Sequence, residues 1–346
     1  GMEGLGQCSS LFEHDAPFYH WEAKRGAEWS SDALIVKQKL AALREKFGAP
    51  PNIVYILADD VGWGELGSYL GGPLRGTPSP VLDKLAGNGL QFLSAYSEPT
   101  CTPSRVALLT GRQPTRTGFT TVPFPGSKDG LDQEEITVAE VLSQKGYATA
   151  MFGKWHVGEL PEHGPENQGF DQALYGLYNG APFAFEEANA HYADEHATIV
   201  GSPTFYDYPG HEGYDAEWDI PVQGIFRSVK GGPREEVMTL NSSMVMEDLE
   251  RISIGEMEEF IRSSNRAKKP FFVYWPTYFQ QMASSPAAHR HGNGVDSRNN
   301  QAAQLGQHEE YVQRLVTTLE NEGIAENTLI VWYSDNGPMY GFWPTA

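Results

Sequence analysis

The sequence predicts an α/β fold in which a mostly parallel or mixed central sheet carries helices on both faces. Three apolar runs, at 52–58, 270–275 and 328–333, carry this prediction. Runs of this kind form strands that are buried on both faces of a parallel sheet. Segments with a helical spacing of apolar residues lie between them, at 243–263 and 307–322. Strands that alternate with helices are typical of a parallel sheet covered on both sides.

Further elements continue the alternation. A short amphipathic helix is predicted over 136–145, ends at Gly146 and leads into a strand over 148–152. Another helix is predicted to open at Pro103, directly after Cys101. Residues 176–235 are rich in Gly, Pro, Tyr and Asp and have no clear period, which predicts a long functional loop region.

Two parts of the chain differ in organisation. Residues 1–48 are predicted to form an N-terminal extension with one amphipathic helix, because Leu34, Leu40, Leu43 and Phe47 follow a helical spacing. Residues 49–346 are predicted to form the main domain, which would hold any catalytic site. Its length is sufficient for one large α/β domain with a substantial core.

Composition narrows the classes of function. The chain has 346 residues and a formal net charge of −20, which argues against nucleic acid and anionic membranes as partners. No run is long and apolar enough to span a bilayer. The first ten residues lack a charged start followed by an apolar stretch, so no signal peptide is predicted, although Gly1 before Met2 leaves room for a removed one. The two cysteines, Cys8 and Cys101, do not make a disulfide framework.

Polar residues follow two of the buried strands at their carboxyl ends, where open α/β sheets bind ligands. Asp59 and Asp60 follow the run 52–58, and Asp335 and Asn336 follow the last run. These four side chains offer oxygen ligands only, which favours Ca²⁺ or Mg²⁺ over Zn²⁺. Either pair alone is explained by an ordinary turn. The two pairs together predict a metal site.

Cys101 stands at a predicted helix N-terminus, where backbone N–H groups and the helix dipole favour anions. Arg105, one turn later, can neutralise a nucleophile or a bound oxyanion. Two other interpretations are a buried structural cysteine and a thiolate nucleophile.

Lys154 and His156 follow a strand and share one side if the chain stays extended. There Lys can bind an anion and His can act as acid or base, although a surface location explains them equally well.

A nucleotide cofactor is rejected. The segment Gly62-Trp63-Gly64-Glu65-Leu66-Gly67 matches the spacing of a dinucleotide-binding loop after a strand. Such a loop must open a helix, whereas the residues from 68 to 80 are rich in Gly and Pro. Two carboxylates, Asp59 and Asp60, would also repel a pyrophosphate.

Five motifs in order resemble the sulfatase family of the alkaline-phosphatase superfamily, over residues from about 51 to 337. The motifs are Ala58-Asp59-Asp60-Val61-Gly62-Trp63-Gly64, Cys101-Thr102-Pro103-Ser104-Arg105 with Leu109-Thr110-Gly111-Arg112 after it, Gly153-Lys154-Trp155-His156, Gln168-Gly169-Phe170-Asp171 and Ser334-Asp335-Asn336-Gly337. The resemblance implies the alkaline-phosphatase-like sulfatase fold and a sulfuric ester hydrolase. It also implies that a separate formylglycine-generating enzyme oxidises Cys101 to Cα-formylglycine.

The resemblance assigns a role to each site residue. One hydroxyl of the hydrated aldehyde attacks the sulfur of a small or glycan sulfate ester, and the other later expels sulfate. Arg105 stabilises residue 101, Lys154 contacts the sulfate, and His156 acts as the base. The implied ligands of Ca²⁺ or Mg²⁺ are Asp59, Asp60, residue 101, Asp335 and Asn336.

The sequence departs from the family pattern in two places. Gln281 stands where the family usually has a His that binds sulfate and helps to protonate the leaving group. Glutamine can donate a hydrogen bond but cannot transfer a proton, so His289 or His291 would have to replace that function. The sequence stops nine residues after Gly337. Family members continue there with another active-site Lys and a C-terminal subdomain, so that subdomain is expected to be missing.

These departures keep two alternatives open. The first is a phosphonate or phosphodiester hydrolase of the same superfamily, which can carry the same Cys-x-Pro-x-Arg motif. The second is a catalytically impaired relative that binds an anionic glycan or only a metal. Because family members are mostly exported, a periplasmic or extracellular location is expected.

Overall fold

The computed structural model describes residues 16–123, 127–177, 223–240, 243–278 and 300–338. The chain divides into two compact units, Gly1–Pro51 and Asn52–Ala346. Within the first unit, the described residues form the helix α1 (Ala16–Phe47). This helix begins well before Leu34, the first of the residues whose spacing predicted it. None of the described helices combines the length and the apolar character that crossing a bilayer requires.

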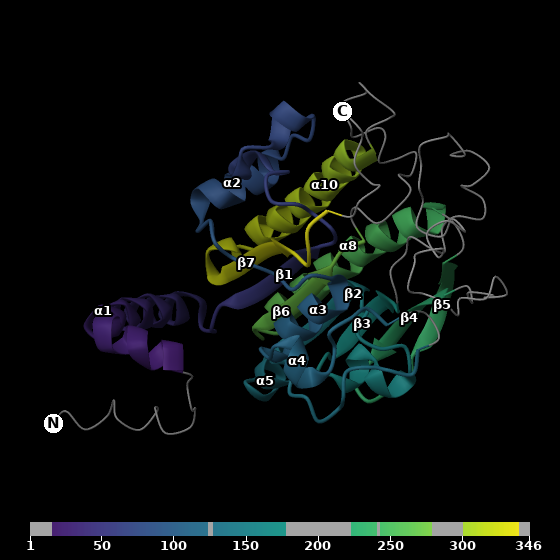
Figure 1. Ribbon diagram of the computed structural model, residues 1–346, viewed down its shortest axis with the longest axis horizontal. Helices are drawn as coiled ribbons and strands as arrows, with labels where there is room; N and C mark the ends of the chain where they lie inside the picture. Colours follow the sequence, from purple (N-terminus) through teal and green to yellow (C-terminus); the bar gives the residue numbers. More distant parts are fainter. Residues whose placement is uncertain (1–15, 124–126, 178–222, 241–242, 279–299, 339–346) are drawn as a thin grey trace. The chain divides into compact units, whose positions relative to one another are not determined.

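The described part of the second unit is built on a seven-stranded sheet with the order β5-β4-β3-β2-β6-β1-β7 (Figure 1). The segment from β3 to β7 is parallel, and β4 and β5 extend one edge in antiparallel pairing. The predicted mixed, mostly parallel sheet is thus confirmed. The strands are β1 (Asn52–Ala58), β2 (Ala148–Lys154), β3 (Gln172–Gly176), β4 (Gln223–Val229), β5 (Glu235–Leu240), β6 (Phe271–Pro276) and β7 (Thr328–Ser334).

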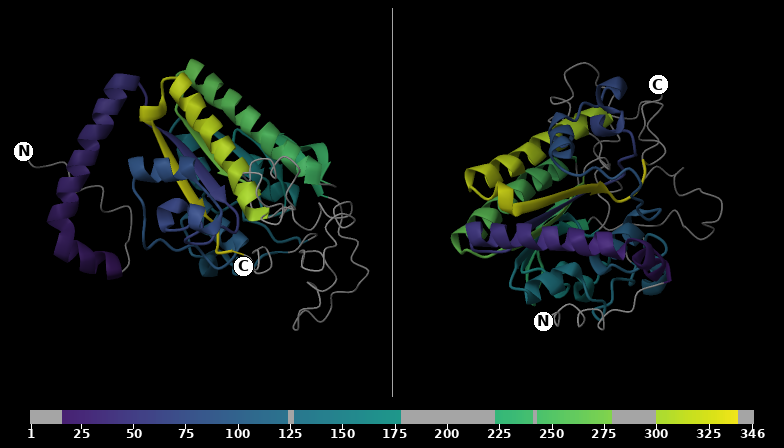
Figure 2. Two further views of the ribbon diagram at one scale, coloured as in Figure 1. Left: turned by 90° about the horizontal axis from the view of Figure 1, so that it is seen from above. Right: turned by 90° about the vertical axis from the view of Figure 1, so that its left-hand side faces the viewer.

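Helices cover both faces of this sheet (Figures 1 and 2). One face packs against α2, α8 and α10, and the other packs against α3 and α5, with the short α4 beside α3. Their bounds are α2 (Pro80–Asn88), α3 (Cys101–Thr110), α4 (Pro114–Thr117), α5 (Val138–Gln144), α8 (Ser243–Arg266) and α10 (Asn300–Asn321). Single 3₁₀ turns are η1 (Gly67–Tyr69), η2 (Gly72–Arg75), η3 (Pro161–His163), η4 (Pro165–Asn167) and η5 (Ala325–Asn327).

Alternation along the strands divides the core into two clusters. In β1, Val54 and Ile56 pack on the side of α8 and α10, whereas Leu57 packs on the side of α3 and α5. In β6, Trp275 faces α8 and α10, and Tyr274 faces α3 and α5. Because successive side chains of a strand point to opposite faces, apolar residues at consecutive positions are what a strand covered on both sides needs.

Several boundaries differ from the predicted ones. Helix α3 begins at Cys101 itself rather than after it, so this residue belongs to the first helical turn. Strand β2 continues to Lys154, two residues beyond the predicted end. The range 176–235, predicted to be loop, contains β4 and the start of β5, while 178–222 lie outside the described residues. The antiparallel edge strands were missed because their alternation is interrupted by Gly and charged residues.

Candidate active site

The parallel pairing of β1 and β7 brings the two acidic strand ends together. The two strands run in register to Ala58 opposite Ser334. Asp335 N then donates to the carbonyl of Ala58 at 3.0 Å, and Asp60 N donates to Asp335 Oδ1 at 3.2 Å. Asp60 itself has a φ of 59°, in the left-handed region. Non-glycine residues held in this region cluster at functional sites.

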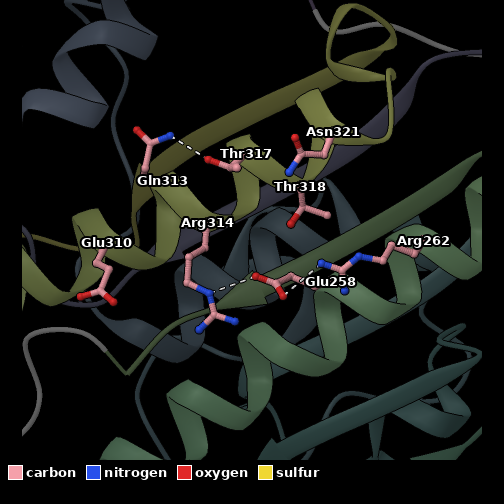
Figure 3. A pocket seen from close by; sticks show the side chains of 8 residues that line it. All are labelled: Glu258, Arg262, Glu310, Gln313, Arg314, Thr317, Thr318 and Asn321. Carbon is pink, nitrogen blue, oxygen red and sulfur yellow. Dashed lines mark hydrogen bonds and ion pairs between the residues drawn. The ribbon is translucent and has the colours of Figure 1, made fainter.

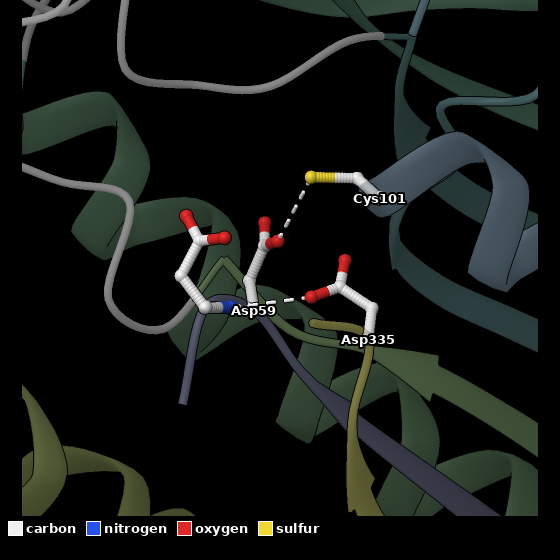
Figure 4. A group of neighbouring side chains, drawn as sticks. Asp59, Cys101 and Asp335 are labelled. Atoms are coloured by element: carbon white, nitrogen blue, oxygen red, sulfur yellow. Dashed lines mark hydrogen bonds between the residues drawn. The ribbon is translucent and has the colours of Figure 1, made fainter. Parts of the chain in front are cut away.

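A compact group of acidic side chains and the cysteine results. Ligand atoms of Asp59, Asp60, Cys101 and Asp335 all lie within 4.8 Å of one another, and all four residues are buried. Figure 4 shows the Cys101 thiol reaching from α3 toward the carboxylates at the strand ends. Its Sγ donates to Asp59 Oδ1 at 3.6 Å. The structure therefore brings together the acidic residues and the cysteine that the sequence singled out.

Two buried cations flank this acidic group. Lys154 Nζ donates to Asp59 Oδ2 at 2.7 Å. Arg105 Nη2 donates to Asp335 Oδ2 at 2.8 Å and lies 3.5 Å from Asp59 Oδ1, while Nη1 donates to the Lys154 carbonyl at 2.8 Å. All four charged side chains are fully buried. Charges at such depth persist only when they are paired, so the lysine predicted as possible surface decoration is part of the site.

The carboxylates of this group differ in their proton affinity. Burial, followed by the charge of Asp335, raises the pKa of Asp59 well above its usual range. Burial also opposes ionisation of Asp335, but Arg105 and Lys154 together hold its pKa below the usual value. Like charges at short range disfavour joint ionisation, and a further positive charge beside the group would favour the ionised form of all three carboxylates.

Cys101 is held as a thiol rather than a thiolate. Burial raises its pKa well above the usual value, and the surrounding carboxylates oppose the stabilising effect of Lys154. Reactive thiolates require the opposite environment, one that lowers the pKa of the thiol. The interpretation of Cys101 as a thiolate nucleophile is therefore disfavoured. A purely structural cysteine is also disfavoured, because its sulfur faces a carboxylate instead of apolar side chains.

His156 lies beyond the end of β2 and is 2% exposed. Burial, followed by the charges of Lys154 and Arg105, lowers the pKa of His156 well below its usual value, so the imidazole is neutral. Its φ of 58° means that the chain is not extended here, contrary to the assumption that put Lys154 and His156 on one side. Thr102 Oγ1 donates to the His156 carbonyl at 2.8 Å and so ties this turn to the first turn of α3.

The residues present fit a hard divalent cation. Asn336 Nδ2 donates to Asp60 Oδ1, and Asn336 Oδ1 is buried without a hydrogen-bond partner among the described residues. When all three carboxylates are ionised, they outnumber the two cationic side chains by one charge, and a divalent ion would offset that excess. Carboxylate and amide oxygens are the donors that Ca²⁺ and Mg²⁺ prefer.

Comparison with known proteins decides the family. The family model described as Sulfatase matches residues 51–342, and human arylsulfatase A is 36% identical over 299 residues. The chain belongs to the sulfatase family. Other similar sulfatases are the N-acetylgalactosamine-6-sulfatase of Canis lupus familiaris, 33% identical over 300 residues, and the N-acetylgalactosamine-6-O-sulfatase of Bacteroides thetaiotaomicron, 32% identical over 311 residues.

Solved sulfatase structures share the fold. The PsFucS1 sulfatase from Pseudoalteromonas sp. has a TM-score of 0.76 at 31% identity. The alignment covers 91% of this chain and 60% of the PsFucS1 chain. Ps i-CgsB in complex with k-i-k-neocarrahexaose has a TM-score of 0.61 at 25% identity. The alignment covers 84% of this chain and 59% of the Ps i-CgsB chain. Alignment with arylsulfatase A covers 84% of this chain and 52% of the relative. The chain thus spans about half the length of the curated relatives it matches, here 52% and 50%.

Not every predicted site residue of this sulfatase-family chain can be placed. Gln281, His289 and His291 lie outside the described residues. Conversely, sequence analysis missed Tyr274, a fully buried residue of β6 whose hydroxyl has no hydrogen-bond partner among the described residues. Its signal was a hydroxyl-bearing residue within an otherwise apolar strand.

A second feature, a hollow of about 340 Å³, lies between α8 and α10 (Figure 3). Two arginines line it, and Glu258 pairs with both, accepting from Arg314 Nε at 3.0 Å and lying 3.4 Å from Arg262. Its remaining lining is polar and open to solvent. This hollow has no unpaired cation for an anion, and so it does not compete with the buried group at the strand ends.

Proposed function

We propose that this sulfatase-family chain carries the nucleophile and the metal site for hydrolysis of a sulfate ester, with Cys101 converted to Cα-formylglycine. The observation that carries the proposal is the buried group of Asp59, Asp60, Cys101 and Asp335, set at the ends of two neighbouring parallel strands. In the proposal, these residues and Asn336 hold Ca²⁺ or Mg²⁺. When bound, the cation and the hydrated aldehyde supply Lewis-acid activation and an oxygen nucleophile, respectively.

The charge of the group suits an anionic substrate. Three carboxylates and two cations give one net negative charge when all are ionised, and a divalent ion changes it to one net positive charge. The site then attracts a sulfate ester although the whole chain has a net charge of −20. Burial strengthens this attraction, because charges interact more strongly where water is excluded.

The chain's own residues would position the reacting groups. Arg105 bridges Asp59, Asp335 and the Lys154 carbonyl. It thereby fixes the Asp59 carboxylate after β1 relative to the Asp335 carboxylate after β7. Lys154, on the opposite side of Asp59, would contact the sulfate. His156 is neutral because of burial and can therefore accept a proton from the group at position 101. Gln281 and His289 remain predicted sulfate contacts.

Sulfated glycans are the proposed substrate class. Support comes from relatives named as N-acetylgalactosamine-6-sulfatases and from the complex of Ps i-CgsB with a neocarrahexaose. Similarity to arylsulfatase A makes an aryl sulfate a practical first substrate. An aryl phosphodiester or phosphonate of matched leaving group tests the alternative chemistry of the superfamily.

The test combines mass spectrometry with turnover. The chain is produced with and without a formylglycine-generating enzyme, and the peptide that contains residue 101 is weighed. Conversion replaces the thiol by an aldehyde, and we expect release of sulfate from an aryl sulfate only from converted protein with Ca²⁺. Converted, Ca²⁺-loaded protein that binds sulfate but hydrolyses neither ester would instead support the anion-binding alternative.

A further inference from the structure

Ser334, the last residue of β7, places a hydroxyl between the two turns that carry the acidic residues. It pairs with Ala58, the last residue of β1. Its Oγ accepts from Val61 N at 2.8 Å and donates to the carbonyl of Asn336 at 2.8 Å. A hydroxyl has one donor and two acceptor positions, so it can make both contacts at once. One side chain therefore bonds to the backbone of the turn after β1 and to that of the turn after β7.

The bond from Val61 helps to fix the backbone of Asp60. Asp60 has a φ of 59°, a left-handed conformation that persists in a non-glycine residue only when the surrounding structure holds it. Its own amide donates to Asp335 Oδ1 at 3.2 Å, and the next amide, that of Val61, donates to Ser334 Oγ. The peptide groups on both sides of the Asp60 Cα are thus bonded to the end of β7. Without the hydroxyl, the second of these peptide groups loses its bond to β7.

The bond to Asn336 acts on the other turn. Asn336 Nδ2 donates to Asp60 Oδ1, so the two residues already touch through their side chains. Ser334 adds a contact through the Asn336 backbone. The same two turns stay close further along the chain, because a Cβ added at Gly62 would lie 2.8 Å from Cδ of Pro338. The relative position of Asp60 and Asn336 therefore depends on contacts between the turns as well as on the pairing of the strands.

We propose that Ser334 is a positioning residue for the metal site: its hydroxyl joins the two turns and so fixes the distance between Asp60 and Asn336. The inference rests on the proposed function, because these two residues matter here as ligands of Ca²⁺ or Mg²⁺. Residues that orient metal ligands contribute roughly 10-fold to 100-fold in metal affinity or activity in characterised sites. Ser334 acts one step further out, through the backbone. We therefore expect a smaller effect, a loss of roughly 3-fold to 10-fold in Ca²⁺ affinity when its hydroxyl is removed.

The test compares Ser334→Ala with Ser79→Ala in the full chain. Ser79 is a matched control, because its Oγ likewise accepts from a backbone amide, Gly67 N at 2.8 Å, and donates to an oxygen, Asp83 Oδ1 at 3.0 Å. Neither of these partners is a proposed metal ligand. Ca²⁺ binding is measured by calorimetry, and thermal stability is measured without metal. The proposal expects weaker Ca²⁺ binding in Ser334→Ala only. Equal Ca²⁺ affinity in the two variants, whatever their melting temperatures, overturns it.

A third variant, Ser334→Thr, keeps the hydroxyl and tests whether that group is what matters. We expect it to bind Ca²⁺ like the unmodified chain. If Ser334→Thr folds but binds Ca²⁺ as weakly as Ser334→Ala, the hydroxyl is not the positioning group and the proposal fails. This variant also keeps the test decisive if the alanine variant does not fold.

A further readout does not need the metal. In metal-free, ¹⁵N-labelled protein, solvent exchange of the Val61 amide proton is followed by NMR. We expect faster exchange of this proton in Ser334→Ala and no change in Ser79→Ala, where the Gly67 amide should exchange faster instead. Unchanged Val61 exchange in Ser334→Ala overturns the proposal. If the unmodified chain binds no Ca²⁺, the proposed metal site fails, but this measurement still decides whether the Ser334 hydroxyl joins the two turns.

Discussion

Lys154 Nζ lies 2.7 Å from Asp59 Oδ2, and both side chains are fully buried. This ion pair joins the end of β2 to the end of β1, two strands that are separated in the sheet by β6. Burial alone would lower the pKa of Lys154. The neighbouring negative groups, Asp59 first among them, together outweigh burial and raise this pKa above its usual value, so the lysine stays charged. The pair therefore places a permanent cation beside the acidic group.

Removing Lys154 is expected to destabilise the metal-free protein more than the metal-bound one. Lys154→Met leaves Asp59 buried without its nearest cation, which costs about 3 kcal/mol in the free energy of unfolding. A saturating divalent ion supplies the missing charge, so the cost should fall when Ca²⁺ is added. Urea unfolding with and without Ca²⁺ measures both values.

A matched control for this prediction is Lys230→Met. Lys230 pairs with Asp171 at 3.9 Å, and the lysine side chain is 52% exposed. Exposed pairs contribute about 0–1 kcal/mol, so this variant should unfold almost like the unmodified chain. A loss in Lys154→Met that is the same with and without Ca²⁺ would show that no cation compensates Asp59.

The alternation of strands and helices made the fold predictable, and the site only in part. Asp59 and Asp335 could be brought together because the carboxyl ends of parallel strands share one edge of a sheet. That β7 is the direct neighbour of β1 was not predictable. Five described strands, β2 to β6, come between the two in the chain, yet all of them lie on the other side of β1 in the sheet. Strand order depends on the packing of helices, which no local pattern encodes.

Individual orientations were the least predictable feature. The surface interpretation of Lys154 was reasonable, because a lysine after a strand is usually solvated. Its burial depends on Asp59, which lies 95 residues away in the chain. The left-handed φ of His156 was likewise not predictable, and its carbonyl accepts from Thr102 of α3, which is distant in sequence.

Cys101→Ala is expected to abolish esterase activity while reducing Ca²⁺ affinity only moderately. The nucleophile of the proposed mechanism is made from this residue, whereas three carboxylates of the metal site remain. A loss of at least about 10³-fold in turnover is expected, because removing a covalent nucleophile leaves only binding and electrostatic stabilisation. Sulfate release and Ca²⁺ calorimetry are the two measurements. Normal turnover by this variant would rule out residue 101 as the nucleophile.

Gly153→Ala is expected to disrupt the site by displacing Lys154, the next residue of β2. Gly153 has a φ of 128°, and a Cβ added there would lie 1.9 Å from the Pro276 carbonyl oxygen of β6. Strand β2 must then move away from β6 and carry Lys154 with it. We expect a loss of at least about 2 kcal/mol in the free energy of unfolding, together with weaker Ca²⁺ binding.

Gly255→Ala is the matched control for the glycine substitution. Gly255 lies within α8, and a Cβ there would meet no atom within 4 Å. Alanine is favoured over glycine inside a helix by up to about 1 kcal/mol, so this variant should be as stable as the unmodified chain or more so. Chemical unfolding of both variants, side by side, checks the prediction, and equal stabilities would contradict it.

Glu250→Gln is expected to stabilise the protein increasingly as the pH rises. Glu250 lies on α8, and burial raises its pKa to about 7, against the weaker opposing effect of a hydrogen bond from Tyr278 N at 2.5 Å. Between the ordinary pKa of 4.5 and this value, the unfolded chain loses the proton while the folded chain keeps it. The unfolded state is thereby favoured, and the unmodified protein loses stability as pH rises through this window, by roughly 3 kcal/mol in all.

Glutamine at this position does not titrate, so the difference in unfolding free energy, Glu250→Gln minus unmodified, should increase from pH 5 to pH 8 and level off above that. Urea unfolding at four pH values measures this difference. The contributions of other groups that titrate in the same range are common to both proteins and cancel. Glu259→Gln, at a 61% exposed side chain of the same helix that pairs with Arg266, controls for the loss of a surface carboxylate. A Glu250→Gln difference that stays constant or falls with pH would mean that Glu250 is ionised in the folded protein.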